Sequence, residues 1–507
     1  MTKPDRPNIL LITSDQQHWS MLGVHRPALK TPHLDRLGAQ GTRFDRAYCP
    51  NPTCTPTRAS LITGLYPSQH GAYSLGTKLP EDVPTLGALL QPAGYDCALI
   101  GKAHFQPLHS TPQYPSIEAY PTLQDLGFWR RFNGPWYGFN HVELARNHTD
   151  EAHVGQHYAV WLEQQGAANW RDWFRPPTGN TPAQTHRWNI PERFHYNTWI
   201  TERASARLEE RGADGRPFFL WASYFDPHPS YLVPEPWASL YPPDSVELPP
   251  QGLDDETRWP ELMRRCRAEG TPSFREWEEP AGSLIHGALN QRFDPVALQK
   301  DIAIYHGMTS MLDHYIGRLL ARLDALGLAE NTLVVFTSDH GHYFGQHGLT
   351  QKGPFHFEDG IRVPLIVRWP GRVPEGRVSS ALQSLVDFAP TFLAAAGEPV
   401  PERMSGRSQL AAWAGDDTAA RTHVMVENRH QPTRLNLRTY LTARHKLTLW
   451  NNPPDDGELY DLEHDPEERR NLWREPSAQA LKSRLLHEFV LAEMDKEPRS
   501  MPRVAVA

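Results

Sequence analysis

Short, mostly apolar segments recur through most of the chain, separated by stretches of helical or polar character. The segments are 8–13, 95–100, 217–221, 332–337 and 363–367. A short continuous apolar run predicts a strand that is buried on both faces, as in the parallel sheets of α/β proteins. The pattern therefore predicts an α/β fold, in which helices sandwich a large, mixed but mostly parallel sheet.

Helical periodicity is clearest over 297–326, where apolar side chains return every three or four positions. Gly327 follows this segment and is a typical helix stop. A shorter helix is predicted to begin at Thr31-Pro32, since threonine caps helices well and proline suits the first turn. These helices lie between predicted strands, as the α/β interpretation requires.

Two long segments, 106–217 and 227–295, interrupt the alternation of strands and helices. The first is rich in tryptophan and histidine, and the second in proline and charged residues. We interpret both as insertions over one end of the sheet, where loops commonly shape ligand specificity. Four tryptophans of the first insertion could stack on a sugar or aryl ring or only pack internally, and packing is expected for most of the aromatics: Trp129, Trp136, Trp188 and Trp199.

The pattern changes after about residue 415. Short alternating segments at 423–426, 438–443 and 446–450 predict antiparallel strands, and 476–494 predicts a final helix. The chain is thus predicted to consist of a catalytic α/β domain, 1–415, and a smaller C-terminal α+β subdomain, 416–507.

Composition and charge narrow the classes of partner. The chain has 507 residues and a net charge of −8, which argues against a nucleic-acid partner. No apolar stretch approaches the length of a membrane span, and the apolar run 9–12 is shorter than the core of a signal peptide. Four cysteines without metal-finger spacing fit a reducing compartment. We therefore expect a cytoplasmic protein with no membrane partner.

The most informative segment is 54–64, CTPTRASLITG. Thr55 is predicted to cap a short helix, with Pro56 at its first position and Gly64 at its end. Cys54 would then lie at the positive end of the helix, where backbone N–H groups attract anions. Arg58 lies one turn further along the same face. A nucleophile, a helix dipole and a guanidinium therefore converge on one site suited to a tetrahedral anion.

Two polar pairs follow predicted strands: Asp15-Gln16 and Asp339-His340. Ligands of open α/β sheets gather at such strand ends. Two carboxylates, an amide oxygen, an imidazole nitrogen and an oxygen of the nucleophile together suit a hard cation such as Ca²⁺, Mg²⁺ or Mn²⁺. Either pair alone is a weak signal, because an aspartate at a strand end is often only a helix cap.

All eleven residues of 54–64 resemble the signature of the type I, formylglycine-dependent sulfatases, members of the alkaline-phosphatase-like superfamily. The resemblance implies that a formylglycine-generating enzyme oxidises Cys54 to formylglycine. It also implies one divalent cation, with Ca²⁺ as the first expectation and Mn²⁺ or Mg²⁺ as alternatives. The implied ligands of that cation are Asp15, Gln16, residue 54, Asp339 and His340.

Gln16 and His340 depart from the usual sulfatase pattern, which has Asp-Asp and Asp-Asn at these pairs. The combination in this chain resembles the sulfatase-fold phosphonate monoester hydrolases. Replacing a carboxylate by Gln16 makes the site less anionic, and a neutral His340 would bind metal through one ring nitrogen. The departure bears on both the metal and the substrate.

Three further segments resemble sulfatase segments: Gly101-Lys102-Ala103-His104, Asp226-Pro227-His228-Pro229, and Lys352 after the Asp339 pair. By this resemblance the metal, Arg58, Lys102 and Lys352 hold the anionic oxygens of the substrate. His228, alone or with Lys352, protonates the leaving oxygen, and His104 accepts a proton in the second step. The implied reaction passes through a covalent sulfo-enzyme.

Three functions follow as hypotheses. The first is hydrolysis of a small anionic sulfate monoester, with an aryl, alkyl or sugar leaving group, as in an arylsulfatase. The second is hydrolysis of a phosphonate monoester or phosphodiester by the same site. The third is non-catalytic anion binding by an unmodified Cys54, against which the set Lys102, His104, His228 and Lys352 argues. The leaving group and the oligomeric state, a homo-oligomer included, stay open.

Overall fold

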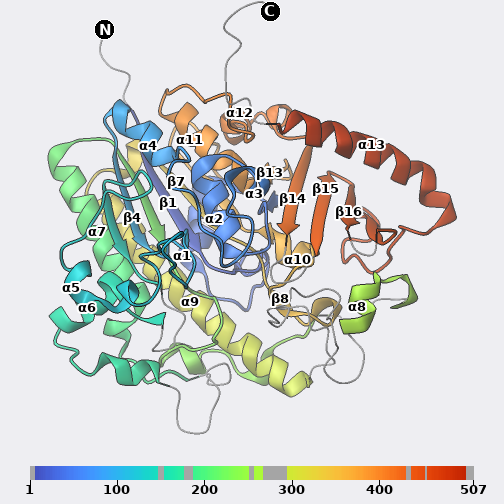
Figure 1. Ribbon diagram of the computed structural model, residues 1–507. Coiled ribbons are helices and arrows are strands. Elements are labelled where there is room, and N and C mark those ends of the chain that lie inside the picture. The colour runs from blue at the N-terminus through green and yellow to red at the C-terminus, as the bar shows by residue number, and fades with distance from the viewer. Residues whose placement is uncertain are drawn as a thin grey trace, which may run out of the picture.

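The centre of the molecule is an eight-stranded sheet with the strand order β12-β2-β11-β7-β1-β6-β4-β5 (Figure 1). The computed structural model describes residues 6–146, 153–175, 187–249, 256–266, 294–429, 435–451 and 454–497. The strands of the sheet are β1 (Asn8–Ser14), β2 (Thr42–Phe44), β4 (Asp96–Gly101), β5 (His141–Leu144), β6 (Phe218–Ser223), β7 (Thr332–Ser338), β11 (Leu365–Arg368) and β12 (Arg377–Ser379).

The sheet is mixed, as the sequence predicts. β7, β1, β6, β4 and β5 run parallel, whereas β11 is antiparallel to both β7 and β2. The predicted strand 363–367 is divided into β10 (Arg362–Val363) and β11, which belong to different sheets. Pro364 lies between them, and a proline cannot donate a hydrogen bond to a strand ladder.

Helices cover both faces of the sheet. Ile9 and Leu11 of β1 pack on the side of α2 (Cys54–Thr63), α4 (Leu86–Leu90) and α11 (Phe388–Ala395). Leu10 and Ile12 point the other way, toward α1 (Pro32–Ala39), α6 (Gln156–Gln164), α7 (Tyr196–Asp214) and α9 (Pro295–Ala325). This alternation confirms the predicted sandwich, because a strand buried on both faces sends successive side chains to opposite layers.

Smaller elements complete this part of the chain. The remaining helices there are α3 (Pro67–His70), α5 (Leu126–Trp129), α8 (Glu261–Cys266), α10 (Glu358–Ile361) and α12 (Leu410–Trp413). β10 pairs with β3 (Ala47–Tyr48), which pairs with β13 (Gln383–Ser384), and β8 (Tyr343–Phe344) pairs with β9 (Thr350–Gln351). No helix among the described residues is both long enough and apolar enough to cross a membrane.

The segment 106–217 does more than lie over one end of the sheet, since it also supplies β5, α6 and α7. Its four named tryptophans are buried, with exposed fractions of 9% for Trp136, 5% for Trp188, 1% for Trp129 and 0% for Trp199. They pack internally, as we expected for most of the aromatics of this segment. Within the second predicted insertion, residues 250–255 and 267–293 lie outside the described residues.

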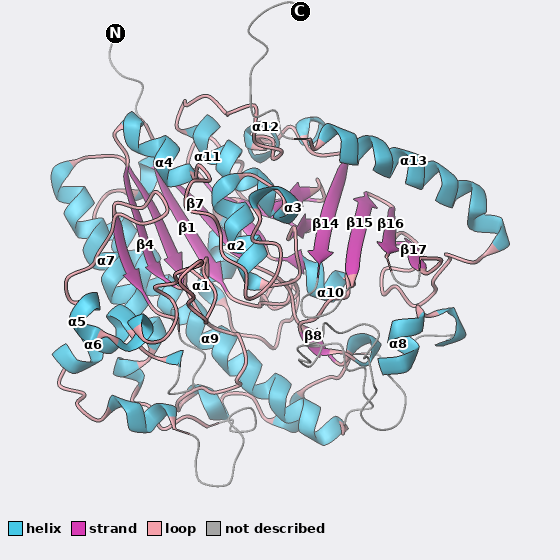
Figure 2. Cartoon of the chain, in the orientation of Figure 1, coloured by secondary structure: helices cyan, strands magenta, loops and turns pink. Residues whose placement is uncertain are grey.

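The C-terminal region forms a separate antiparallel sheet of β14 (His423–Arg429), β15 (Asn436–Thr442), β16 (His445–Trp450) and β17 (Gly457–Asp461) (Figure 2). The apolar side of α13 (Gln479–Asp495) packs on this sheet through Leu485 and Phe489. The amide of Glu427 in β14 donates to the carbonyl of Pro50 at 2.8 Å, just before α2. The small sheet is thus tied to the loop that leads into Cys54. The boundary at residue 415 remains a prediction.

Candidate active site

Helix α2 begins at Cys54, two residues earlier than the sequence predicts. The extended residue Thr53 holds the N-cap position, and its side chain makes no capping hydrogen bond, so the prediction of Thr55 as the cap is wrong. The Asn51 side chain orders the entry instead, accepting from the Thr53 amide at 2.9 Å and from the Thr53 hydroxyl at 2.6 Å. Gly64 ends the helix with φ 65°, as predicted. Cys54 therefore lies in the first turn, at the positive end of the helix dipole.

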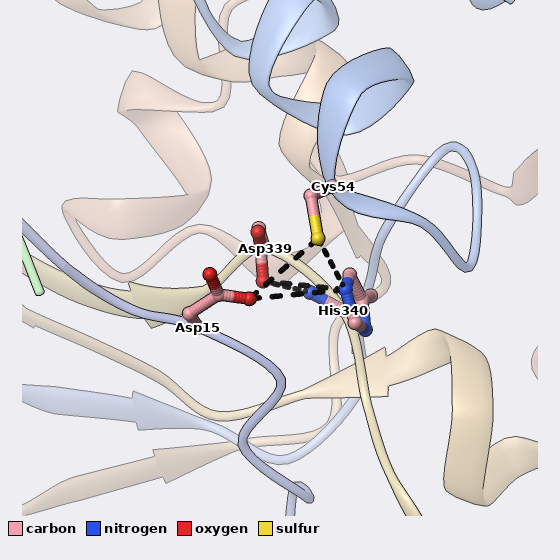
Figure 3. A group of neighbouring side chains, drawn as sticks. All are labelled: Asp15, Cys54, Asp339 and His340. Carbon is pink, nitrogen blue, oxygen red and sulfur yellow. Dashed lines mark hydrogen bonds and ion pairs between the residues drawn. The ribbon is translucent and has the colours of Figure 1, made fainter. Parts of the chain in front are cut away.

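Four side chains converge beside this helix end (Figure 3). The ligand atoms of Asp15, Cys54, Asp339 and His340 all lie within 4.8 Å of one another, and all four residues are buried. Asp15 follows β1 and Asp339 follows β7, and these strands are paired up to their last residues, Ser14 and Ser338. The parallel register explains why residues more than 300 positions apart meet at one edge of the sheet.

The hydrogen bonds of His340 leave one ring nitrogen directed into the cluster. Its Nδ1 lies 3.0 Å from the carbonyl oxygen of Gly341, which only a protonated nitrogen can approach as a donor. Its Nε2 lies 3.1 Å from Sγ of Cys54. A neutral imidazole with its proton on Nδ1 presents the Nε2 lone pair, which is the arrangement of a metal-binding histidine.

Gln16 adjoins the same cluster. Its backbone amide donates to Oδ1 of Asp339 at 3.0 Å, and its Nε2 lies 2.9 Å from Nδ1 of His342. Its Oε1 is buried and has no hydrogen-bond partner among the described residues. An amide oxygen in that position is costly unless a cation fills the gap. The donor set of carboxylates, amide oxygen and imidazole nitrogen therefore fits a divalent cation.

Cationic side chains surround the other side of Cys54. Nζ of Lys352 lies 3.2 Å from Sγ of Cys54, and Nζ of Lys102 lies 3.8 Å from it. Lys102 also forms a fully buried ion pair with Asp15. Burial and Asp15 would raise the pKa of the Cys54 thiol, but the charges of Lys102 and Lys352 outweigh them and lower it. Burial alone would raise the pKa of Asp15, yet Lys102 and Arg58 hold it well below its ordinary value.

Arg58 is completely buried and connects three strand ends. Its Nε donates to Oδ2 of Asp339 at 2.8 Å, and its Nη1 donates to the Lys102 carbonyl at 2.9 Å and to Oγ of Ser223 at 2.8 Å. Its Nη2 lies 3.7 Å from Oδ2 of Asp15 and has no hydrogen-bond partner among the described residues. One donor face of the guanidinium therefore stays available to an anionic oxygen.

His228 follows β6 and pairs with Lys352, whose Nζ lies 2.8 Å from Nε2 of the imidazole. The other ring nitrogen, Nδ1, contacts the carbonyl oxygen of Pro229. Burial, and then the charge of Lys352, lower the pKa of His228 well below its ordinary value. The imidazole is therefore neutral and accepts a hydrogen bond from the ammonium group, so that Lys352 carries the proton nearest to residue 54.

His104 lies on the loop after β4, in a left-handed backbone conformation with φ 58°. The carboxylate of Glu118 accepts hydrogen bonds from three successive amides, those of His104, Phe105 and Gln106, at 2.9, 2.8 and 2.7 Å. Arg146 pairs with Glu118 at 3.3 Å, and both side chains are buried. This buried pair holds a loop conformation that a histidine rarely adopts by itself.

Sequence reasoning did not single out the residues that hold the site in place. Glu118, Arg146 and Ser223 carry no motif, and only their burial as polar side chains marks them. Asp226 stood within a recognised segment, but its contacts could not be predicted. It accepts hydrogen bonds from Tyr196 and Asn197, both at 2.6 Å, and burial raises its pKa to about 7. A signal for such residues exists only in the folded chain.

Comparison with known proteins agrees with this geometry. The sulfatase family model matches residues 7–398, and a model of the N-sulphoglucosamine sulphohydrolase C-terminal region matches residues 345–496. The chain is 29% identical over 501 residues to the uncharacterized sulfatase YidJ of Escherichia coli K12, covering 97% of this chain and 88% of that protein. It is 31% identical over 425 residues to the multifunctional alkaline phosphatase superfamily protein PehA of Trinickia caryophylli, covering 80% and 76%.

Among solved structures, the phosphonate monoester hydrolase of Silicibacter pomeroyi superposes with a TM-score of 0.80. The two chains are 24% identical, and the superposition covers 99% of this chain and 98% of the other. At this level of identity the likeness concerns the fold alone.

Proposed function

Since the chain belongs to the sulfatase family, we propose that it hydrolyses a small sulfate monoester through a formylglycine at position 54. The observation that carries the proposal is the environment of Cys54. The side chain begins a helix, is fully buried, and has Lys352 at 3.2 Å and His340 at 3.1 Å from its sulfur. A nucleophile in such a position has a cationic donor, Lys352, beside it, which can stabilise the negative charge of a tetrahedral anion.

The proposed metal ligands are Asp15, Gln16, Asp339 and His340, together with residue 54. The unpartnered Oε1 of Gln16 and the Nε2 of His340 support this set. A bound divalent cation, with Ca²⁺ as the first candidate and Mn²⁺ or Mg²⁺ as alternatives, would neutralise the carboxylates and polarise an oxygen of the substrate.

Formylglycine, made from Cys54 by a formylglycine-generating enzyme, would supply a hydroxyl nucleophile when its aldehyde is hydrated. Around it, Asp339 is placed to accept the proton of the attacking group. Its Oδ2 is already held by Arg58 at 2.8 Å, and its Oδ1 accepts from the Gln16 amide at 3.0 Å. These hydrogen bonds fix the carboxylate before a substrate arrives, which lowers the cost of reorganisation.

Lys102, Lys352 and the free donor face of Arg58 would hold the sulfuryl oxygens. The contact of Lys352 with His228 at 2.8 Å supports a more specific assignment of the leaving-group proton. Because the pKa of His228 is lowered, its imidazole is a hydrogen-bond acceptor, and Lys352 is the donor of the pair. We therefore assign proton delivery to Lys352, with His228 holding the ammonium in place. His104 is the proposed base of the second step.

Mass spectrometry of residue 54 tests the proposal. The protein would be produced in a host that contains a formylglycine-generating enzyme and digested with trypsin, which releases the peptide Ala47–Arg58. We expect Cys49 to alkylate as an ordinary thiol and residue 54 to have lost its sulfur. Alkylation of both cysteines in such a host contradicts the proposal and favours anion binding by an unmodified Cys54.

The second candidate is hydrolysis of a phosphonate monoester or phosphodiester. Two observations favour keeping it: the amide of Gln16 and the imidazole of His340 stand where carboxylate and amide ligands are usual, which makes the metal site less anionic. Comparing kcat/KM for 4-nitrophenyl sulfate and for a 4-nitrophenyl phosphonate separates the two. A higher value for the sulfate supports the first function, and a higher value for the phosphonate supports the second.

A further inference from the structure

The Gln16 side chain is held by a buried chain of hydrogen bonds that leads away from the candidate metal site. Its Nε2 lies 2.9 Å from Nδ1 of His342, and Nε2 of His342 lies 3.1 Å from the hydroxyl of Tyr231. The three side chains have exposed fractions of 1% for Gln16, 0% for His342 and 7% for Tyr231. This series of hydrogen bonds thus connects the segments that follow β1, β7 and β6.

The backbone of Gln16 is fixed as well. Its carbonyl accepts a hydrogen bond from Tyr305 of α9 at 2.7 Å, and its amide donates to Asp339 at 3.0 Å. Gln16 has φ 60°, a left-handed conformation that non-glycine residues seldom adopt. The main chain is therefore set by contacts on both sides, and the remaining freedom of Gln16 is the rotation of its side-chain amide.

His342 removes that freedom. An amide presents a donor and an acceptor at almost the same place, so its orientation depends on what faces it. Nδ1 of His342 faces the nitrogen of the amide, and it can accept only if the imidazole proton lies on Nε2, toward Tyr231. With its nitrogen engaged, the amide directs Oε1 to the side where no described residue hydrogen-bonds it.

We propose that His342 is a positioning residue for the metal site, which, supported by Tyr231, orients the Gln16 amide so that its oxygen is presented to the cation. This inference rests on the proposed function, because it assumes that Gln16 is a metal ligand. It assigns to His342 no contact with substrate or metal. Groups that orient a ligand in this way typically contribute about 10–100-fold to metal affinity.

Isosteric substitutions separate the two nitrogens of His342. In His342→Asn the amide oxygen replaces Nδ1 and keeps the acceptor that faces Gln16, whereas in His342→Gln the amide reaches the position of Nε2, next to Tyr231. His347→Gln is the matched control, because His347 is also buried and lies nearby in the chain, in the turn between β8 and β9, but stacks on Phe357 with the ring centroids 3.7 Å apart. Each variant would be purified, checked for conversion of residue 54, and stripped of metal.

The dissociation constant for Mn²⁺ and, separately, for Ca²⁺ is then measured by chelator competition, with the melting temperature of the metal-free protein beside it. We expect His342→Gln to weaken metal binding by about 10–100-fold. His342→Asn and His347→Gln should stay within a few-fold of the wild type. Tyr231→Phe, which removes only the hydroxyl, should weaken binding less than His342→Gln.

Other outcomes overturn the inference in distinguishable ways. Equal metal affinity in the wild type and His342→Gln, with a lower melting temperature, would make His342 merely structural. Equal losses in His342→Asn and His342→Gln would show that the acceptor facing Gln16 is not what matters. A wild-type protein that binds neither ion would overturn the metal assignment of the proposed function, and this inference with it.

Discussion

The two sides of residue 54 are built differently. On one side, Asp15 and Asp339 follow the central strands β1 and β7 directly, and their positions are fixed by the register of a parallel pair in the middle of the sheet. On the other side, Lys102 directly follows β4, His228 lies on the loop after β6, and Lys352 follows the short strand β9, which lies outside the central sheet; we call this set the loop side. The first side consists of acceptors and suits a cation, and the second presents donors to an anion.

This difference predicts a division of labour. The carboxylates at the strand ends bind a metal ion and must be held rigidly. The groups that bind and protonate the substrate can be carried by loops, which move more easily. Substitutions on the strand side should lose metal and rate together. Substitutions on the loop side should lose rate while the metal stays bound.

Cys54→Ala should have the largest effect, because both sides act on the group at this position. We expect turnover of an aryl sulfate to fall by at least about 10⁴-fold, as when a covalent nucleophile is removed. The melting temperature should change little, since the replaced side chain is small. The measurement is a steady-state rate beside a thermal melt. A residual rate within about tenfold of the wild type would mean that residue 54 is not the nucleophile.

Asp339→Asn probes the strand side. It removes one of two carboxylates from the cluster and weakens the bond that Arg58 makes at 2.8 Å. We expect kcat/KM to fall roughly 10³-fold and the bound metal to be lost during gel filtration. The metal content is measured by mass spectrometry of the eluted protein. Full metal occupancy with a lowered rate would break the proposed division, because Asp339 would then act as a base only.

Lys352→Ala probes the loop side. Loss of a general acid typically costs about 10²–10⁴-fold, and the cost grows with the basicity of the leaving group. We therefore expect a steep dependence of rate on the leaving-group pKa in the variant, a shallow one in the wild type, and unchanged metal content. Lys30→Ala, at an exposed position, is the control. If the dependence stays shallow, Lys352 holds the anion but does not deliver the proton.

The sequence allowed much of the strand side to be predicted. Apolar runs and the polar residues that end them mark β1 and β7, and parallel pairing then brings Asp15 and Asp339 together. It did not allow the supporting contacts to be predicted. Glu118 reaches three backbone amides of the His104 loop from 12 to 14 residues away, and no local pattern encodes that approach.

The local errors have physical causes as well. Thr55 has the side chain of a good cap, but Asn51 orders the chain before the helix, so that the helix starts at Cys54. The strand predicted over 363–367 is apolar throughout, and Pro364 divides it between two sheets. In both places a tertiary contact or a missing donor outweighed the local preference.

Asp226 joins the two sides, and its titration gives the smallest and most specific prediction. Its carbonyl accepts a hydrogen bond from the Asp15 amide at 3.2 Å, and the same residue begins the loop that carries His228. Burial raises its pKa to about 7. The unfolded chain would lose this proton near about pH 4, so between these values the folded state binds more protons, and stability falls as pH rises.

Asp226→Asn removes this titration. We expect its melting temperature to fall less steeply than that of the wild type between about pH 4.5 and about pH 7.5. Relative to the wild type, the melting temperature of the variant should be lowest at the acid end of this range. Because Asn can still accept from Tyr196 or Asn197, the fold should persist. Parallel melting curves over this range would mean that Asp226 is ionised in the folded protein. In that case Asp226, which connects the strand side to the loop side, would carry a constant negative charge over this range, and its titration would not make the stability of the protein depend on pH.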